Sequence, residues 1–139
     1  METTPSIFMV DDNPGDIALV HLALEDAGIR ANLRNAHDGG IAIAQLGALA
    51  ADSLQRLPNL ILVDLNMPKV TGWEVLAYLR GHEILSRVPS FVLSTSQSPR
   101  DLARCQELGF SCWSKPSRFE DYATLIKYMR PFLSPTTAG

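Results

Sequence analysis

The chain has 139 residues, a length that suits one domain with a single sizeable core. Its composition, 46% hydrophobic and 19% charged residues, is that of a globular protein and excludes an intrinsically disordered one. The formal net charge of -3, without a dense cluster of Lys or Arg, argues against direct binding of nucleic acid.

The sequence shows no signal for membrane insertion or secretion. No apolar stretch approaches the roughly 20 residues that a membrane span requires, and the N-terminal METTPS lacks a charged region followed by an apolar run. We therefore expect a cytoplasmic protein. Cys105 and Cys112 could in principle pair, but in such a chain we expect them to be reduced, packed thiols.

Five short apolar segments have the character of β-strands. The first, third and fourth are nearly continuous apolar runs, as in strands that are buried on both faces. The second, ANLRNA, is weaker, and the fifth, FSCW, follows Gly109. In chain order we expect strands over Ser6–Val10, 31–36, 60–63, Ser90–Ser94 and 110–113.

A helical pattern follows each of these strands, because apolar residues recur there at spacings of three or four. Pro14 fits the first turn of the first helix and Gly28 fits its end. Gly72 and Pro99 lie near the starts of the third and fourth helices. The chain thus alternates strand and helix five times, with short connections.

This alternation predicts an α/β fold of the flavodoxin-like type. It is a doubly wound (βα)5 unit with a five-stranded parallel sheet in the order 2-1-3-4-5. We expect residues 1–139 to form one domain. The second helical region is expected over 39–56, and the fifth from about 117 to near 131.

Polar side chains stand where the predicted strands end. Ligands of an open parallel sheet bind beyond the carboxyl ends of its strands. We therefore expect three carboxylates, a hydroxyl and an ammonium to converge at one edge. They come from Asp11 and Asp12 after the first strand, Asp64 after the third, Ser94 at the end of the fourth and Lys115 after the fifth.

Three carboxylates this close repel one another unless a cation offsets their charge. Mg²⁺ prefers oxygen ligands and is usually held by one or two carboxylates together with phosphate oxygens. We expect Asp12 and Asp64 to bind the metal directly and Asp11 to bind it through water. The backbone carbonyl of Asn66 is expected to complete the protein's ligands.

A carboxylate beside Mg²⁺ can also act as a nucleophile toward phosphorus and form an aspartyl phosphate. Phosphoryl transfer depends mainly on positioning and on neutralisation of charge. Asp64 is the expected nucleophile, at the tip of a buried strand. Lys115 is expected to supply a second positive charge, and the Ser94 hydroxyl is expected to bind a phosphoryl oxygen after transfer.

Four motifs together resemble the receiver domain of two-component response regulators, of the chemotaxis-regulator-like kind. They are MVDDNPGD, LILVDLNMPKVTGWEVL, PSFVLSTSQS and SKP, and the resemblance covers essentially the whole chain. DDNPGD and LSTSQS are most similar to small single-domain response regulators that are paired with phytochrome histidine kinases. The resemblance implies a receiver domain over residues 1–139 with no separate output domain.

The resemblance also assigns roles to residues of this chain. It implies Mg²⁺ as the metal and, as phosphodonor, a phosphohistidine on a sensor histidine kinase, here a bacteriophytochrome. The phosphoacceptor falls on Asp64, the acidic metal-binding pair on Asp11 and Asp12, the metal-binding carbonyl on Asn66, the switch hydroxyl on Ser94, and the lysine that precedes a proline on Lys115.

Two positions depart from the family pattern. The family usually has Ala after the switch hydroxyl, whereas this chain has Thr95, which is expected to narrow the route to Asp64. The switch aromatic usually lies three residues before the lysine, at Cys112, whereas the ring here is Trp113. Either Trp113 has taken that role or the protein switches without an aromatic residue. Successive side chains of a strand point to opposite faces of the sheet, so a ring at Trp113 would lie on the face opposite to that of Cys112.

Other classes of function fit less well. A haloacid-dehalogenase-like phosphatase needs a second Asp two residues after the nucleophile, where this chain has Asn66. A flavodoxin-like cofactor binder needs a Gly- or Ser/Thr-rich phosphate loop, where this chain has the acidic DDNPGD. We therefore expect a phosphorylated switch and not a turnover enzyme. A phosphate shuttle or sink in a multistep phosphorelay is the alternative.

The expected switch changes a protein-binding surface. Phosphorylation should bias the face formed by the fourth helix, fifth strand and fifth helix between two arrangements. Apolar residues near the C-terminus suggest a homodimer through this face. The residues expected at that interface are Tyr122, Met129, Phe132 and Leu133.

Overall fold

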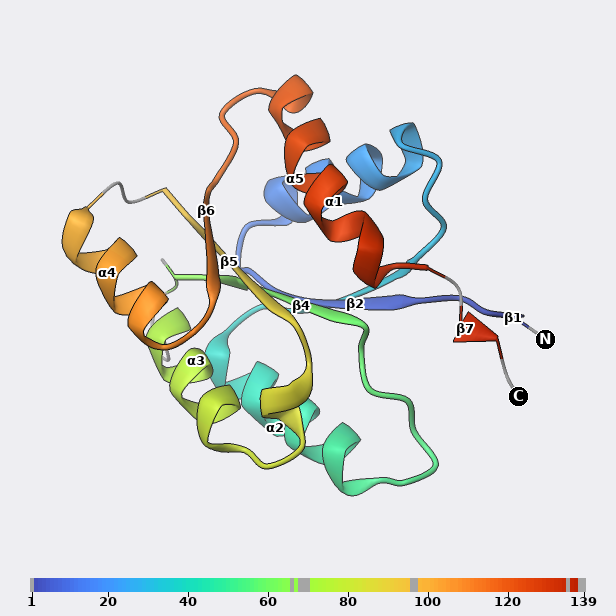
Figure 1. Ribbon diagram of the computed structural model, residues 1–139, viewed down its shortest axis with the longest axis vertical. Coiled ribbons are helices and arrows are strands. Elements are labelled where there is room, and N and C mark those ends of the chain that lie inside the picture. Colours follow the sequence, from blue (N-terminus) through green and yellow to red (C-terminus); the bar gives the residue numbers. More distant parts are fainter. Residues whose placement is uncertain (1, 66, 68–70, 96–97, 135, 138–139) are drawn as a thin grey trace.

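A computed structural model describes residues 2–65, 67, 71–95, 98–134 and 136–137. Its centre is a parallel sheet in the strand order β3-β2-β4-β5-β6, which is 2-1-3-4-5 when its strands are counted along the chain. This confirms the predicted fold class (Figure 1). The strands are β2 (Ser6–Val10), β3 (Asn32–Ala36), β4 (Leu60–Asp64), β5 (Ser90–Ser94) and β6 (Ser111–Ser114).

Helices cover both faces of the sheet (Figure 1). Helices α1 and α5 pack against Ile7, Met9 and Leu62 on one face, and α2 and α3 pack against Phe8, Ile61 and Val63 on the other, where α4 adds Cys105. Adjacent residues of β2 and β4 thus serve opposite cores, as the two-residue period of a strand requires. The helices are α1 (Pro14–Asp26), α2 (Gly39–Ala51), α3 (Gly72–Gly81), α4 (Pro99–Glu107) and α5 (Tyr122–Met129).

Two predicted helices were too long. Helix α2 ends at Ala51 and not near 56, because Asp52 takes an extended conformation and its side chain accepts a hydrogen bond from the Leu54 amide at 2.9 Å. The predicted fifth helix is divided. Its α-helical part α5 lies between two short 3₁₀ turns, η2 (Phe119–Asp121) and η3 (Arg130–Phe132).

The expectation of two separate thiols is wrong in this structure. Cys105 on α4 and Cys112 on β6 are joined in a disulfide, with their Cα atoms 6.4 Å apart. The connection between α4 and β6 turns at Gly109, whose φ of +83° favours glycine. This tight turn returns the chain along α4 and brings the two cysteines together.

A second, two-stranded sheet joins the two ends of the chain. Strand β1 (Glu2–Thr3) pairs antiparallel with β7 (Thr136–Thr137). Figure 1 shows the termini side by side, away from the carboxyl ends of the central strands. Among the helices of the described residues, none is long and apolar enough to span a membrane.

Candidate functional site

Three acidic side chains meet at the carboxyl ends of the central strands. Asp11 directly follows β2 and is fully buried, while Asp64 is the last residue of β4 and is only 4% exposed. Asp12, next to Asp11, is exposed. One ligand oxygen from each of the three carboxylates lies within 4.8 Å of the others. The structure therefore brings together the predicted acidic cluster.

Local contacts hold Asp11 and the start of α1 in place. The Asp11 amide donates to the carbonyl of Ala36 at 3.1 Å, which extends the pairing of β2 with β3. Asp11 Oδ1 accepts a hydrogen bond from the Asn13 amide at 2.9 Å. Asn13 itself caps α1, because its Oδ1 accepts from the Gly15 amide at 2.8 Å. Asp11 is therefore not the cap of α1, and its Oδ2 is directed to the site.

Gly72 allows α3 to begin against the end of β4. A Cβ atom at this position would collide with the backbone carbonyl of Asp64 and with Leu65. The spacing between Asp64 and Gly72 therefore reflects a close approach of two backbones. The helix is capped by Thr71, whose hydroxyl accepts from the Glu74 amide at 3.4 Å.

The Lys115 ammonium lies among three carboxylates. Its Nζ is 3.2 Å from Asp11 Oδ2 and 3.2 Å from Asp64 Oδ2. A third carboxylate, Asp16, is closer still, with its Oδ2 at 2.6 Å. The Lys115 backbone amide donates to the Ser94 carbonyl at 2.9 Å, which fixes the chain where it leaves β6. The predicted pairing of Lys115 with the acidic site is present in the structure.

Asp16 was not identified from the sequence. It lies in the first turn of α1, three residues after the Asn13 cap. The signal was the third carboxylate of DDNPGD: Pro14 starts the helix, so a residue two positions later lies within its first turn. That Asp16 faces the site and not solvent follows from the direction in which the Asn13 cap sets α1.

The charges of the site shift the pKa values of its groups. Burial raises the pKa of Asp11 from 3.8 to about 6; the Asn13 hydrogen bond and the Lys115 charge oppose this shift, and the Asp64 charge adds to it. Burial by itself would lower the pKa of Lys115. The hydrogen bond to Asp16 and the charges of Asp11 and Asp64 outweigh burial and raise it well above its ordinary value.

The acidic cluster fits a divalent cation. Burial raises the pKa of Asp11 to about 6, so the Lys115 charge, 3.2 Å away, does not fully stabilise the ionised carboxylate. Asp11 Oδ2 is buried, and its contact with Lys115 Nζ at 3.2 Å is that of an ion pair. Clustered carboxylate oxygens suit hard divalent cations such as Mg²⁺ or Mn²⁺. Asn66, whose carbonyl was predicted to be a ligand, lies outside the described residues.

Ser94 ends the strand next to that of Asp64, and Thr95 directly follows it. The register pairs Asp64 with Leu93, so Ser94 is one residue further along β5. Ser94 is 8% exposed, and Thr95 is exposed. The structure thus brings the predicted switch hydroxyl to the same edge of the sheet. That Thr95 narrows the route to Asp64 stays a prediction.

The register of β6 answers the question of Cys112 and Trp113. Val92 pairs with Cys112, and Leu93 pairs with Trp113. Cys112 packs with Val92 on the face covered by α2 and α3, which Ser94 shares by alternation along β5. Trp113 packs on the opposite face, with its ring 5.9 Å from that of Phe91 and 4.7 Å from that of Tyr128. Trp113 has therefore not replaced an aromatic residue at the position of Cys112.

Comparisons with known proteins identify the family of the chain. The family described as the response regulator receiver domain matches residues 7–127. The response regulator Rcp1 of Synechocystis sp. is 38% identical over 127 residues, which cover 91% of this chain and 86% of Rcp1.

Two solved structures show the same fold at the level of the whole chain. The Mn²⁺-bound form of Rcp1 has a TM-score of 0.79 and 33% identity, and the match covers 97% of this chain and 99% of that one. The phosphorylated cyanobacterial phytochrome response regulator RcpA has a TM-score of 0.81 and 31% identity, with 97% and 100% covered.

Proposed function

The chain belongs to the response regulator receiver family, and we propose that it accepts a phosphoryl group on Asp64 from a phosphohistidine of a sensor histidine kinase. The observation that carries this proposal is the position of Asp64. Its carboxylate ends a strand that is buried along its whole length, and Lys115 Nζ lies 3.2 Å from its Oδ2. A nucleophile is thus held rigidly beside a cation at the sheet edge.

Asp11, Asp12 and Asp64 would hold the metal ion, for which we propose Mg²⁺, together with the Asn66 carbonyl predicted from the sequence. When bound, the ion supplies positive charge that offsets the carboxylates and the phosphoryl oxygens. That the similar structure of Rcp1 is a Mn²⁺-bound form supports a divalent metal in this chain as well.

The residues of the chain carry out the transfer. A carboxylate oxygen of Asp64 attacks phosphorus, the bond between phosphorus and the histidine nitrogen breaks, and that nitrogen leaves with the electron pair. The Lys115 ammonium then donates a hydrogen bond to a phosphoryl oxygen, for which it need move little from Asp64. The Ser94 hydroxyl is placed on the adjacent strand to bind another phosphoryl oxygen.

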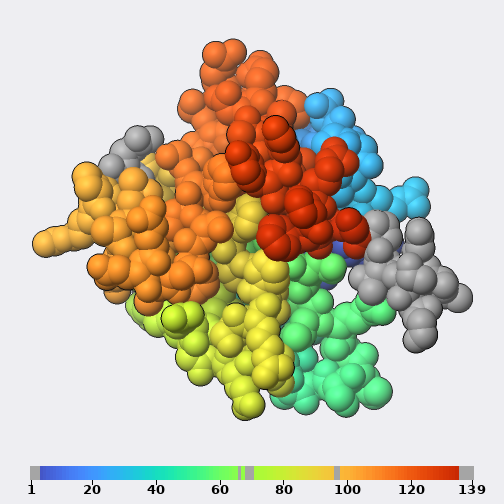
Figure 2. Space-filling model, in the orientation of Figure 1, coloured from blue at the N-terminus to red at the C-terminus, as the bar shows by residue number. Residues whose placement is uncertain are grey.

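In this proposal the chain is a phosphoacceptor that assists its own phosphorylation and dephosphorylation, and not a turnover enzyme on a separate substrate. Phosphoryl transfer to Asp64 adds charge at the site and draws the Ser94 hydroxyl toward it. The change then reaches α4, β6 and α5, which follow β5 in the chain. Figure 2 shows these elements, in orange to red, as one continuous surface.

The proposed kinase is a phytochrome-type photoreceptor. Support comes from the name of RcpA, a phytochrome response regulator that matches 97% of this chain. Service as a phosphate shuttle or sink in a phosphorelay is the second candidate, since a receiver of this kind can also pass its phosphoryl group to a histidine protein.

A homodimer through the face of α4, β6 and α5 also remains a proposal, with a different set of residues. Tyr122, Met129 and Leu133 are at most 4% exposed and belong to the core, so their prediction as interface residues is wrong. Phe132 is 38% exposed, and Tyr128, on the same helix as Tyr122, is 51% exposed. These two rings are the large apolar groups that α5 and η3 offer to a partner.

Intact-mass spectrometry after incubation with acetyl phosphate and Mg²⁺ tests the proposed function. We expect one added phosphoryl group in the wild-type chain and none with Asp64→Asn or with EDTA. Asp26→Asn is the matched control, because Asp26 is an exposed carboxylate at the far end of α1. Phosphoryl addition that persists in Asp64→Asn would contradict the proposal.

A further inference from the structure

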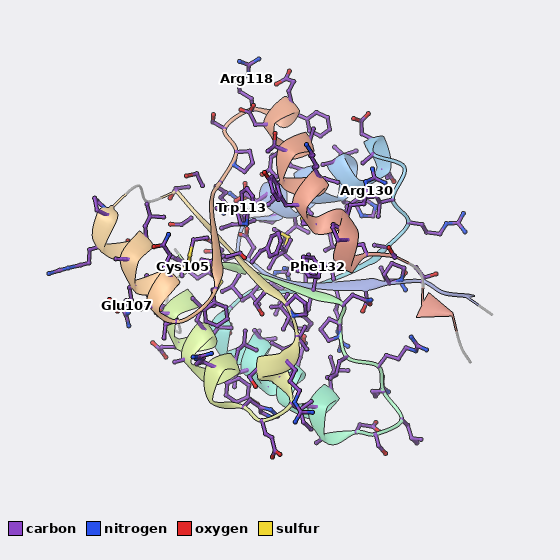
Figure 3. The ribbon with its side chains drawn as sticks, viewed as in Figure 1. Cys105, Glu107, Trp113, Arg118, Arg130 and Phe132 are labelled. Atoms are coloured by element: carbon purple, nitrogen blue, oxygen red, sulfur yellow. A yellow bond between two sulfur atoms is a disulfide. The ribbon has the colours of Figure 1, made fainter. Side chains whose placement is uncertain are left out.

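The disulfide links two elements that flank the end of β5. Cys105 lies near the last turn of α4 and is 1% exposed, whereas Cys112 lies in the middle of β6 and is partly exposed. Figure 3 shows Cys105 on α4 turned toward β6. The bond therefore fastens a helix to the edge strand of the sheet, across the turn at Gly109.

The same bond lies next to Ser94. A cavity of only about 10 Å³ lies between α4 and the sheet, and Ser94, Cys105 and Cys112 all line it. Ser94 and Cys112 belong to neighbouring strands that pair Ser94 with Ser114 and Val92 with Cys112, so both side chains face α4. With so little free volume, a movement of Ser94 or of α4 must be shared with the two sulfur atoms.

We propose that Cys105 and Cys112 are a reversible redox modification site, whose disulfide restrains α4 against β6 and so limits how far phosphorylation of Asp64 changes this surface. The inference rests on the proposed function, since it concerns the response to that phosphoryl group. Its reactant is a low-molecular-weight disulfide of the glutathione class.

The exposure of the two cysteines sets the order of the reaction. The partly exposed Cys112 loses its proton, and its thiolate attacks one sulfur of the oxidised glutathione, forming a mixed disulfide and releasing one glutathione thiolate. The buried Cys105 then loses its proton, and its thiolate attacks the Cys112 sulfur and displaces the second glutathione thiolate. Two protein thiols are oxidised to a disulfide, one glutathione disulfide is reduced to two thiols, and a reduced thiol in excess reverses both steps.

The disulfide and dithiol forms should differ in the freedom of α4. In the disulfide form a covalent bond joins its last turn to β6. In the dithiol form weaker contacts remain, such as the hydrogen bond from the amide of Phe110, one residue before β6, to the Cys105 carbonyl at 3.3 Å. Trp113, directly after Cys112, is a natural reporter because its indole Nε1 is buried and has no hydrogen-bond partner among the described residues.

The first experiment measures the redox reaction. The full chain is equilibrated with oxidised or reduced glutathione, unfolded in denaturant so that the buried Cys105 becomes accessible, alkylated with iodoacetamide and weighed by intact-mass spectrometry. We expect two alkyl groups after reduction and none after oxidation, with full reversal when the buffers are exchanged. Thiols that remain open to alkylation in oxidised glutathione would overturn the proposal.

The second experiment measures the response. Beryllofluoride, an analogue of the phosphoryl group, is added with Mg²⁺ to both redox forms of the wild-type chain. The shift of the Trp113 indole ¹H–¹⁵N signal is recorded, and Trp73→Phe assigns that signal. We expect the shift in the disulfide form to be at most half of that in the dithiol form. The double variant Cys105→Ser/Cys112→Ser is the matched control and should respond equally under both conditions.

Equal Trp113 shifts in the two wild-type forms, or no shift in either, would overturn the inference. Labelling of both redox forms with acetyl phosphate, measured by mass spectrometry, distinguishes failure of this inference from failure of the proposed function. Phosphoryl addition with equal shifts would leave the proposed function intact. The absence of phosphoryl addition in either form would refute the proposed function itself, and with it the link to the disulfide.

Discussion

The strands β4 and β6 belong to one sheet but offer their side chains opposite conditions. β4 lies between β2 and β5, and all five of its residues are buried. Among the described strands, β6 pairs with β5 alone, and it is at most partly buried. β4 carries Asp64, whereas β6 carries Cys112 and Trp113. In our account, the phosphoryl acceptor lies on a strand that is paired on both sides. The conformational response to phosphorylation occurs at a strand that is paired on one side.

This difference also concerns charge. Around the ends of β2 and β4, one ammonium faces three carboxylates within 3.2 Å, so electrostatics dominates the energetics. Around β6, a disulfide and aromatic contacts dominate. Substitutions at the carboxyl ends of β2 and β4 should therefore alter stability through charge and metal binding. Substitutions around β6 should alter it through packing and chain entropy.

Lys115→Met should give the largest loss of stability. It leaves Asp11, Asp16 and Asp64 without the ammonium that they share. Removing one partner of a buried ion pair costs about 3–5 kcal/mol, and we expect a loss of this size in metal-free protein at neutral pH. Mg²⁺ should restore much of it, as measured by urea unfolding. Lys127→Met, at an exposed position of α5, is the control; equal losses in both variants would contradict the charge argument.

Asp11→Asn should stabilise the metal-free protein, in a pH-dependent manner. Because the pKa of Asp11 is raised from 3.8 to about 6, folding favours its protonated form. The wild-type chain therefore loses stability as the pH rises from about 4 to about 6, and Asn does not. The advantage of the variant should reach up to about 3 kcal/mol above pH 6, at about 1.4 kcal/mol per pKa unit.

Chemical unfolding of wild type and Asp11→Asn between pH 4 and pH 8, in EDTA, measures this difference. The variant should also lose the gain in stability that divalent metal gives the wild type. A difference that is constant across the pH range would show that the Asp11 carboxylate does not titrate in the way its buried position requires.

Reduction of the disulfide should lower stability at the edge of the sheet. The bond closes a loop with a sequence separation of 7. In the chain-entropy account, a loop of this length contributes about 2.5 kcal/mol. Denaturant unfolding of oxidised and reduced wild type measures the effect, and Cys112→Ser should match the reduced form under both conditions. A Cys112→Ser variant as stable as the oxidised wild type would contradict this assignment.

Phe132→Ala should have the smallest effect. Its ring meets that of Phe91 edge to face, with centroids 5.8 Å apart, and is 38% exposed. An aromatic pair of this kind contributes about 1 kcal/mol, and we expect a loss of that order in thermal or chemical unfolding. Phe119→Ala, at a ring 41% exposed on η2, is the control and should cost less. In ultracentrifugation, Phe132→Ala should also weaken any self-association through α5 and η3.

The fold and the charged cluster at the ends of the strands could be predicted from the sequence because both depend on local patterns. Buried strands have continuous apolar runs, and the parallel strands of a doubly wound sheet end at one edge. The residues that follow those strands must then meet, which placed Asp11, Asp64 and Lys115 together. The boundaries were less predictable. The helical region predicted for α2 continued past Ala51 to Arg56, but the Asp52 side chain stabilises a turn there instead.

The features that sequence reasoning missed depend on orientation in three dimensions. Asp16 reaches Lys115 because the Asn13 cap sets the direction of α1. The disulfide forms because the chain turns back at Gly109. Tyr122 and Met129 were expected at an interface because they are apolar and near the C-terminus, yet α5 turns them into the core.

The central claim is that Asp64 is the acceptor of the phosphoryl group. The most direct measurement is reduction of the phosphorylated chain with borohydride, which converts an aspartyl phosphate to homoserine, followed by peptide mass spectrometry. Our account predicts homoserine at position 64 and none at the neighbouring carboxylates Asp11, Asp12 and Asp16. Homoserine at one of those three positions, with Asp64 unchanged, would contradict it.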